Sequence, residues 1–145
     1  MTSPVWIIDG SQVARTILKI TLRREGIAST CYSEGSEALR DLWELPGDAP
    51  GLMLIEGQLP DMDGYDVIMQ VRRLLSRRQT AIVVLSNRSG MLDRLRGRLS
   101  GADDSLTKPF LVADVRDVVG KHLQRVGRWP ATTPAADTEA RPVYQ

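Results

Sequence analysis

The sequence predicts an α/β fold with a parallel sheet, because short apolar runs alternate with amphipathic segments of helical length. Several of the apolar runs contain no polar alternation, which is typical of strands covered by helices on both faces. The chain has 145 residues, a length that suits one domain with a core of its own. The expected strands are residues 5–8, 28–32, 52–55, 81–85 and 104–107.

The first expected helix follows the strand at 5–8 and ends at Gly26. Ser11 can cap it, because a serine side chain accepts a hydrogen bond from an unpaired backbone N–H of the first turn. Val13, Ile17 and Ile20 recur at helical spacing, so this stripe is expected to face the core.

Four further helices are expected, each after a strand. Ser36 is expected to cap the second helix, which ends before Pro46, and a short arginine-rich helix is expected over 91–99. The predicted buried stripes of the other helices are Ala38, Leu39 and Leu42; Ile68, Val71 and Leu75; and Val112, Val115, Val119 and Leu123.

Composition sets limits on function. The formal net charge is +1, so the chain has no general attraction to nucleic acid or anionic membranes. Cys31 is the only cysteine, the first residues do not resemble a secretion signal, and no apolar run is long enough to cross a bilayer. We expect a cytoplasmic protein. Residues 1–126 are expected to form the domain, and the proline-rich segment 127–145 a disordered tail.

Four of the expected strands end at a polar residue, namely Asp9, Glu56, Ser86 and Lys108. In an open parallel sheet, side chains beyond the carboxyl ends of the strands converge on one crevice where ligands bind. Two carboxylates, a hydroxyl and an ammonium group suit an anion together with a hard cation such as Mg²⁺. Each residue alone is more often a helix cap, a turn residue or half of a salt bridge, so the prediction depends on the set.

Two longer segments make the pattern specific. The segment 58–65, Gln-Leu-Pro-Asp-Met-Asp-Gly-Tyr, and the segment 101–110, Gly-Ala-Asp-Asp-Ser-Leu-Thr-Lys-Pro-Phe, resemble signature segments of bacterial response-regulator receiver domains. The resemblance extends from about Val5 to Leu123. It implies a three-layer (βα)5 flavodoxin-like fold, a strand order of 2-1-3-4-5, and a cis bond between Lys108 and Pro109.

The sequence departs from that family at three positions. Glu56 stands where the family has its phosphoacceptor aspartate, Gly10 replaces the second of two adjacent acids, and Ser105 replaces an aromatic switch residue. The extra methylene of glutamate displaces its carboxylate by about 1–1.5 Å. An error of about 1 Å in an in-line attack can cost roughly a hundredfold in rate. We therefore expect ordinary phosphoryl switching to be impaired.

The function expected is that of a stand-alone, atypical receiver that acts through protein–protein contact and is not an enzyme. The resemblance implies a partner face formed by helix 4, strand 5 and helix 5, with a sensor kinase or effector as partner, and allows a homodimer. No nucleic-acid or membrane partner is expected. No cofactor is expected beyond weakly bound Mg²⁺, whose ligands would be Asp9, Glu56 and the backbone of Gln58.

Two alternatives stay open from the residues. In one, the chain still phosphorylates itself with Mg²⁺ held by Asp9. In the other, the same architecture binds a flavin-like molecule, although the turn Asp9-Gly10-Ser11-Gln12 is a poor phosphate loop. Two roles are open for Glu56. Its permanent carboxylate could bias the domain toward one conformation, or it could simply form an ion pair with Lys108.

Overall fold

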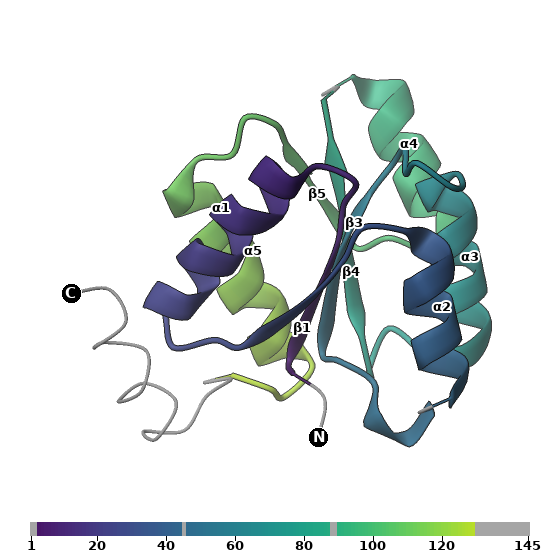
Figure 1. Cartoon of the computed structure of the whole chain (residues 1–145), viewed down its shortest axis with the longest axis horizontal. Helices are drawn as coiled ribbons and strands as arrows, with labels where there is room; N and C mark the ends of the chain where they lie inside the picture. Colours follow the sequence, from purple (N-terminus) through teal and green to yellow (C-terminus); the bar gives the residue numbers. More distant parts are fainter. Residues whose placement is uncertain (1–2, 45, 88–89, 130–145) are drawn as a thin grey trace.

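The computed structural model describes residues 3–44, 46–87 and 90–129, and these form a five-stranded parallel sheet of order β2-β1-β3-β4-β5 between two layers of helices (Figure 1). The predicted fold class and strand order are confirmed. The strands are β1 (Val5–Ile8), β2 (Ser29–Tyr32), β3 (Leu52–Glu56), β4 (Ala81–Ser86) and β5 (Asp104–Thr107). The helices are α1 (Gln12–Arg24), α2 (Gly35–Glu44), α3 (Gly64–Leu74), α4 (Met91–Ser100) and α5 (Val112–Arg125), with a 3-10 turn at Pro46–Asp48.

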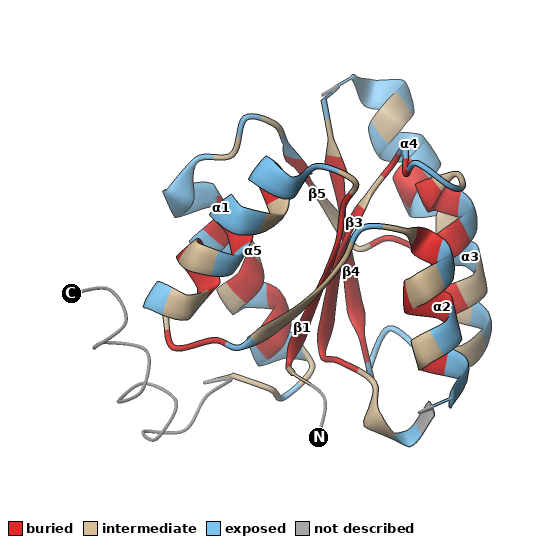
Figure 2. Cartoon of the chain, viewed as in Figure 1, coloured by how far each residue is buried: buried red, intermediate tan, exposed pale blue. Residues whose placement is uncertain are grey.

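Helices α1 and α5 cover one face of the sheet, and α2, α3 and α4 cover the other (Figures 1 and 2). Because successive side chains of a strand point to opposite faces, each central strand supplies both cores. In β1, Val5 and Ile7 pack toward α1 and α5, whereas Trp6 and Ile8 pack toward α2 and α3. This two-sided burial explains why the central strands are apolar throughout.

One predicted stripe is wrong. Helix α1 buries Ala14, Leu18 and Leu22, whereas Val13 and Ile17 are 69% and 44% exposed. The two stripes are offset by one residue along the same helix, and both are apolar, so periodicity alone does not select between them. The other predicted stripes face the core, except that Val112 at the start of α5 is exposed.

The predicted cap of α2 is also wrong, because Ser36 lies inside the helix. Asp61, in the loop after β3, accepts hydrogen bonds from the backbone N–H groups of Gly35 and Ser36, both at 2.9 Å. Although partial desolvation opposes the effect, the bonds from Ser36 and Gly35 lower the pKa of Asp61. The cap is therefore supplied from 25 residues away and ties the loop to α2.

The described chain continues past α5 to Trp129, whose side chain packs against the core on the α1 and α5 side. Arg128 donates a backbone hydrogen bond to the carbonyl of Leu123 at 2.7 Å. Ordered contacts therefore extend three residues beyond the predicted boundary at 126. The rest of the predicted tail, residues 130–145, lies outside the described residues.

An ion cluster around one buried carboxylate joins the start of β5 to the neighbouring elements. The Asp103 carboxylate, 8% exposed, contacts Arg72, Arg77 and Arg125 at 2.7, 2.8 and 3.3 Å. It also accepts the backbone N–H of Ile82 at 2.8 Å. Since the three arginines come from α3, the α3–β4 loop and α5, this one carboxylate connects both helical layers to the edge of the sheet.

Removal of that carboxylate should destabilise the fold, because Arg72, whose side chain is 13% exposed, then loses its buried partner and the N–H of Ile82 loses its acceptor. We expect Asp103→Ala to lower the free energy of unfolding by about 3 kcal/mol in urea denaturation. Asp114→Ala, at an exposed carboxylate on α5, should change it by less than about 0.5 kcal/mol. Equal effects of the two substitutions would contradict a structural role for the cluster.

Candidate functional site

The carboxyl ends of β1, β3 and β4 and the loop after β5 bring the predicted residues to one edge of the sheet. Lys108 lies between the two acids, with its Nζ 2.7 Å from Oδ2 of Asp9 and 2.8 Å from Oε2 of Glu56. Ser86, at the end of β4, lines the cavity of about 220 Å³ that Glu56 also lines. The bond between Lys108 and Pro109 is cis, as the resemblance implied.

Asp9 is fully buried and holds the start of α1. Its Oδ1 accepts the backbone N–H of Ser11 at 2.8 Å, and the Ser11 side chain in turn accepts the N–H of Ala14, as expected of the helix cap. The approach of Lys108 to Oδ2 is an ion pair whose angles do not meet those of a hydrogen bond. Arg15, which the sequence did not single out, donates to the carbonyl of Asp9 at 2.6 Å.

Glu56 uses both of its carboxylate oxygens within the protein. Oε2 accepts a hydrogen bond from Lys108, and Oε1 accepts the backbone N–H of Gly10 at 3.0 Å. The extra methylene of glutamate supplies the reach to this N–H in the β1–α1 turn. The side chain therefore links three chain segments, 46 and 52 residues apart in sequence from Glu56.

Pro60 fills the space beside Gly10. A Cβ atom built on Gly10 would lie 2.7 Å from Cγ and 2.8 Å from Cδ of Pro60, closer than carbon atoms pack. Any side chain at position 10 would therefore require the loop after β3 to shift. The loop after β3 can lie in this position only because residue 10 has no side chain.

The ionisable groups of the site shift one another's pKa values. Burial raises the pKa of Asp9, and the negative charge of Glu56 adds to this, although Lys108 and the N–H of Ser11 oppose it. For Lys108, burial lowers the pKa, but the contacts with Asp9 and Glu56 together outweigh burial and raise it. Two carboxylates against one ammonium leave a formal charge of −1, which the burial of Asp9 makes costly.

These residues do not form a ready cation site. Each of the four carboxylate oxygens already faces an N–H or the ammonium group within 3.0 Å. Among the residues that the structure describes, no three histidine, cysteine or acidic side chains gather to hold a metal ion. Gln58, the predicted backbone ligand, is exposed and lines the same cavity as Glu56. The donor set therefore fits Mg²⁺ poorly.

Ser105 lies apart from this cluster. It lines a groove between α4 and β5, together with Gly97 and Ala102. Tyr65, at the start of α3, reaches the same groove, and the guanidinium of Arg96 lies 4.2 Å above its ring. Sequence reasoning did not single out Tyr65, because it falls inside the resembling segment and reads there as an ordinary core position.

His122, on α5, is a buried histidine. It is 3% exposed, and its Nε2 lies 3.0 Å from Oδ2 of Asp104 on β5. Although burial opposes it, the contact with His122 lowers the pKa of Asp104. The pair is a contact between α5 and β5 and lies outside the candidate site.

Comparison with known proteins supports this architecture. The sequence profile of the response regulator receiver domain matches residues 5–120. The chain belongs to this family. It is 26% identical to a two-component response regulator from Clostridium difficile, with a TM-score of 0.76, over 86% of this chain and 98% of that one. A response regulator from Chloroflexus aurantiacus J-10-fl is 25% identical, with a TM-score of 0.76, over 86% of this chain and 99% of that one.

The fold extends to more distant members. A CheY-like receiver domain protein from Methanospirillum hungatei JF-1 shares 18% identity and a TM-score of 0.76, over 88% of this chain and 98% of that one. Within the described part of the receiver domain, no helix has the length and apolar character needed to span a membrane.

The raised pKa of Lys108 has a consequence for stability at high pH. The folded state holds this proton more tightly than the unfolded chain, whose lysine pKa is near 10.5. The stabilisation is therefore complete below pH 10.5 and is lost as the pH rises through the higher folded pKa. We expect urea denaturation to show this alkaline loss in the wild type and a smaller one in Lys108→Met. Identical alkaline slopes in the two proteins would contradict the ion pairs.

Proposed function

We propose that this receiver domain transmits its signal through protein contacts in one fixed conformation, without taking up a phosphoryl group and without enzymatic activity. The observation that carries the proposal is the position of the Glu56 carboxylate, bound at once by Gly10 and Lys108. An anionic group that belongs to the chain satisfies the N–H and the ammonium group that face the site. Because this group is covalently attached, its occupancy does not depend on a phosphodonor.

The proposal extends to the metal. Divalent cations bind where carboxylate oxygens are available for coordination, and Mg²⁺ requires near-octahedral geometry. Here Lys108 occupies the position between Asp9 and Glu56, and Pro60 takes the space beside Gly10. We propose that the domain works without Mg²⁺. The roles predicted for Asp9, Glu56 and Gln58 as metal ligands stay predictions.

For Glu56, the contacts favour the ion pair over a switch. The aromatic residue expected on β5 is replaced by Ser105, so no large side chain of β5 is present to change its packing with the state of the site. The proposed output surface is the face of α4, β5 and α5, where α4 exposes Leu92, Leu95 and Leu99. A sensor kinase, an effector protein or a second copy of the chain would bind to this face. The cytoplasmic location of the protein stays a prediction.

The direct test is incubation with acetyl phosphate and Mg²⁺, followed by intact-mass measurement. We expect the wild type to gain no phosphoryl group. Glu56→Asp shortens the side chain and frees the Gly10 N–H, and we expect it to gain one phosphoryl group under the same conditions. A gain of mass by the wild type that is lost in Glu56→Gln would overturn the proposal.

A further inference from the structure

The cavity that Glu56 lines lies at the ends of β3 and β4 and has a volume of about 220 Å³. Because a cavity of about 150 Å³ can hold a benzene molecule, this one has room for a small organic molecule. Its lining is rich in oxygen. Among the described residues that line it, every polar side chain except that of Arg96 offers an oxygen atom, namely Glu56, Gln58, Tyr65, Ser86, Asn87 and Asp93.

The cations at this cavity already have carboxylate partners. The ammonium group of Lys108 is paired with both Asp9 and Glu56. The guanidinium group of Arg96 contacts Asp63 at 2.6 Å and lies 4.2 Å above the ring of Tyr65. An anion that entered the cavity would have to compete with these carboxylates for either cation.

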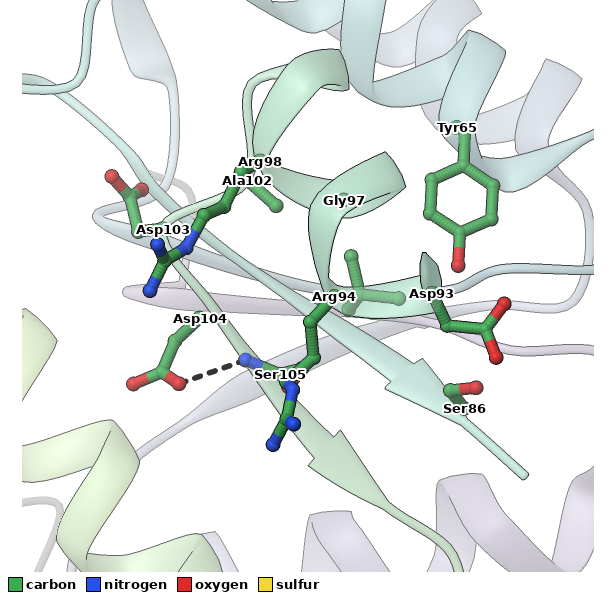
Figure 3. A pocket seen from close by; sticks show the side chains of 11 residues that line it. Tyr65, Ser86, Asp93, Arg94, Gly97, Arg98, Ala102, Asp103, Asp104 and Ser105 are labelled. Carbon is green, nitrogen blue, oxygen red and sulfur yellow. Dashed lines mark hydrogen bonds between the residues drawn. The ribbon is translucent and has the colours of Figure 1, made fainter. Parts of the chain in front are cut away.

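Asp93, the third residue of α4, has no such partner. It is half-buried and lines the cavity, and Figure 3 shows its carboxylate between the side chains of Tyr65 and Ser86. Over residues 3–44, 46–87 and 90–129, no cation forms an ion pair with it. Arg94 and Arg98 line the neighbouring groove between α4 and β5, and neither pairs with Asp93.

The surplus charge at the cavity is therefore negative. The described groups at the cavity and next to it comprise four carboxylates and two cations, with a formal charge of −2: Asp9, Glu56, Asp63 and Asp93 against Lys108 and Arg96. One available carboxylate among neutral oxygen acceptors suits an ammonium group, which carries one charge and three N–H donors. A divalent cation requires more carboxylate oxygens than Asp93 alone provides.

From the cavity, its oxygen lining and the unpaired Asp93, we propose that this cavity binds the primary ammonium group of a small organic amine. The ammonium group pairs with Asp93, and the side-chain oxygens of Gln58 and Asn87 accept its other N–H groups. The inference rests on the proposed function, because the cavity keeps this charge only while Glu56 stays bound to Gly10 and Lys108.

The probe is n-butylammonium chloride, titrated at pH 7 and constant ionic strength into the ¹⁵N-labelled full chain without Mg²⁺ or a phosphodonor. We expect saturable amide shift changes centred on Gly57, Asn87 and Asp93, with a Kd on the order of 10 mM for so small a ligand. Binding should weaken at higher salt. 1-Butanol, which has the same carbon chain without the charge, should bind at least about tenfold more weakly.

The matched variants remove the same charge from the same position of two helices. Asp93→Asn keeps the size of the side chain and should weaken butylammonium binding about tenfold. Asp114→Asn is the control, because Asp114 is the third residue of α5 and does not line the cavity, and both helices lack a side-chain cap. It should bind as the wild type does. Equal thermal midpoints of the two variants would exclude loss of fold as the cause.

Several results would overturn the inference. These are equal affinity of Asp93→Asn and the wild type, equal binding of 1-butanol, or no saturable binding. The same shift changes with Mg²⁺ at lower concentration would assign the cavity to a divalent cation instead. Tighter binding of the peptide acetyl-Ala-Ala-Lys-Ala-Ala-amide would assign it to a lysine of a partner protein.

The two proposals fail separately. The titration contains no phosphodonor, so an unphosphorylated wild type that does not bind butylammonium would refute only the amine site. A wild type that gains a phosphoryl group from acetyl phosphate would refute the proposed function, whatever the amine titration shows.

Discussion

The site depends on the two ion pairs that the ammonium group of Lys108 forms with Asp9 and Glu56. The ammonium group lies 2.7 Å from one carboxylate and 2.8 Å from the other, and it joins the loop after β5 to the ends of β1 and β3. Asp9 is fully buried, so its charge is tolerable only because a cation and the N–H of Ser11 face it. This pairing fixes where Glu56 can point and leaves its second oxygen for Gly10.

The departures from the family pattern act together in this structure. The longer arm of Glu56 reaches the backbone of Gly10, and the absence of a side chain at that position lets Pro60 pack beside it. An acid at position 10 would have to displace Pro60 and would add a second negative charge next to Glu56. The same combination therefore strengthens internal contacts and removes oxygen ligands that a divalent cation needs.

Much of the fold was predictable from the sequence, because buried parallel strands and their polar ends leave a direct pattern in it. The convergence of Asp9, Glu56 and Lys108 followed from topology alone. What the sequence could not supply depends on distant pairs, such as the cap of α2 by Asp61 and the burial of His122 against Asp104. The α1 stripe failed for a different reason, since two apolar faces compete on one helix and only packing selects the buried one.

The central claim, that Glu56 binds the Gly10 N–H and the Lys108 ammonium group and the domain therefore takes up no phosphoryl group, is tested most directly with a phosphoryl mimic. ¹⁹F NMR of the protein with beryllium, fluoride and Mg²⁺ reports whether the mimic binds at the end of β3. The account predicts no bound signal for the wild type and a bound, Mg²⁺-dependent signal for Glu56→Asp. A bound signal in the wild type that disappears in Lys108→Met would show that the site still accepts a phosphoryl group, and the account would be wrong.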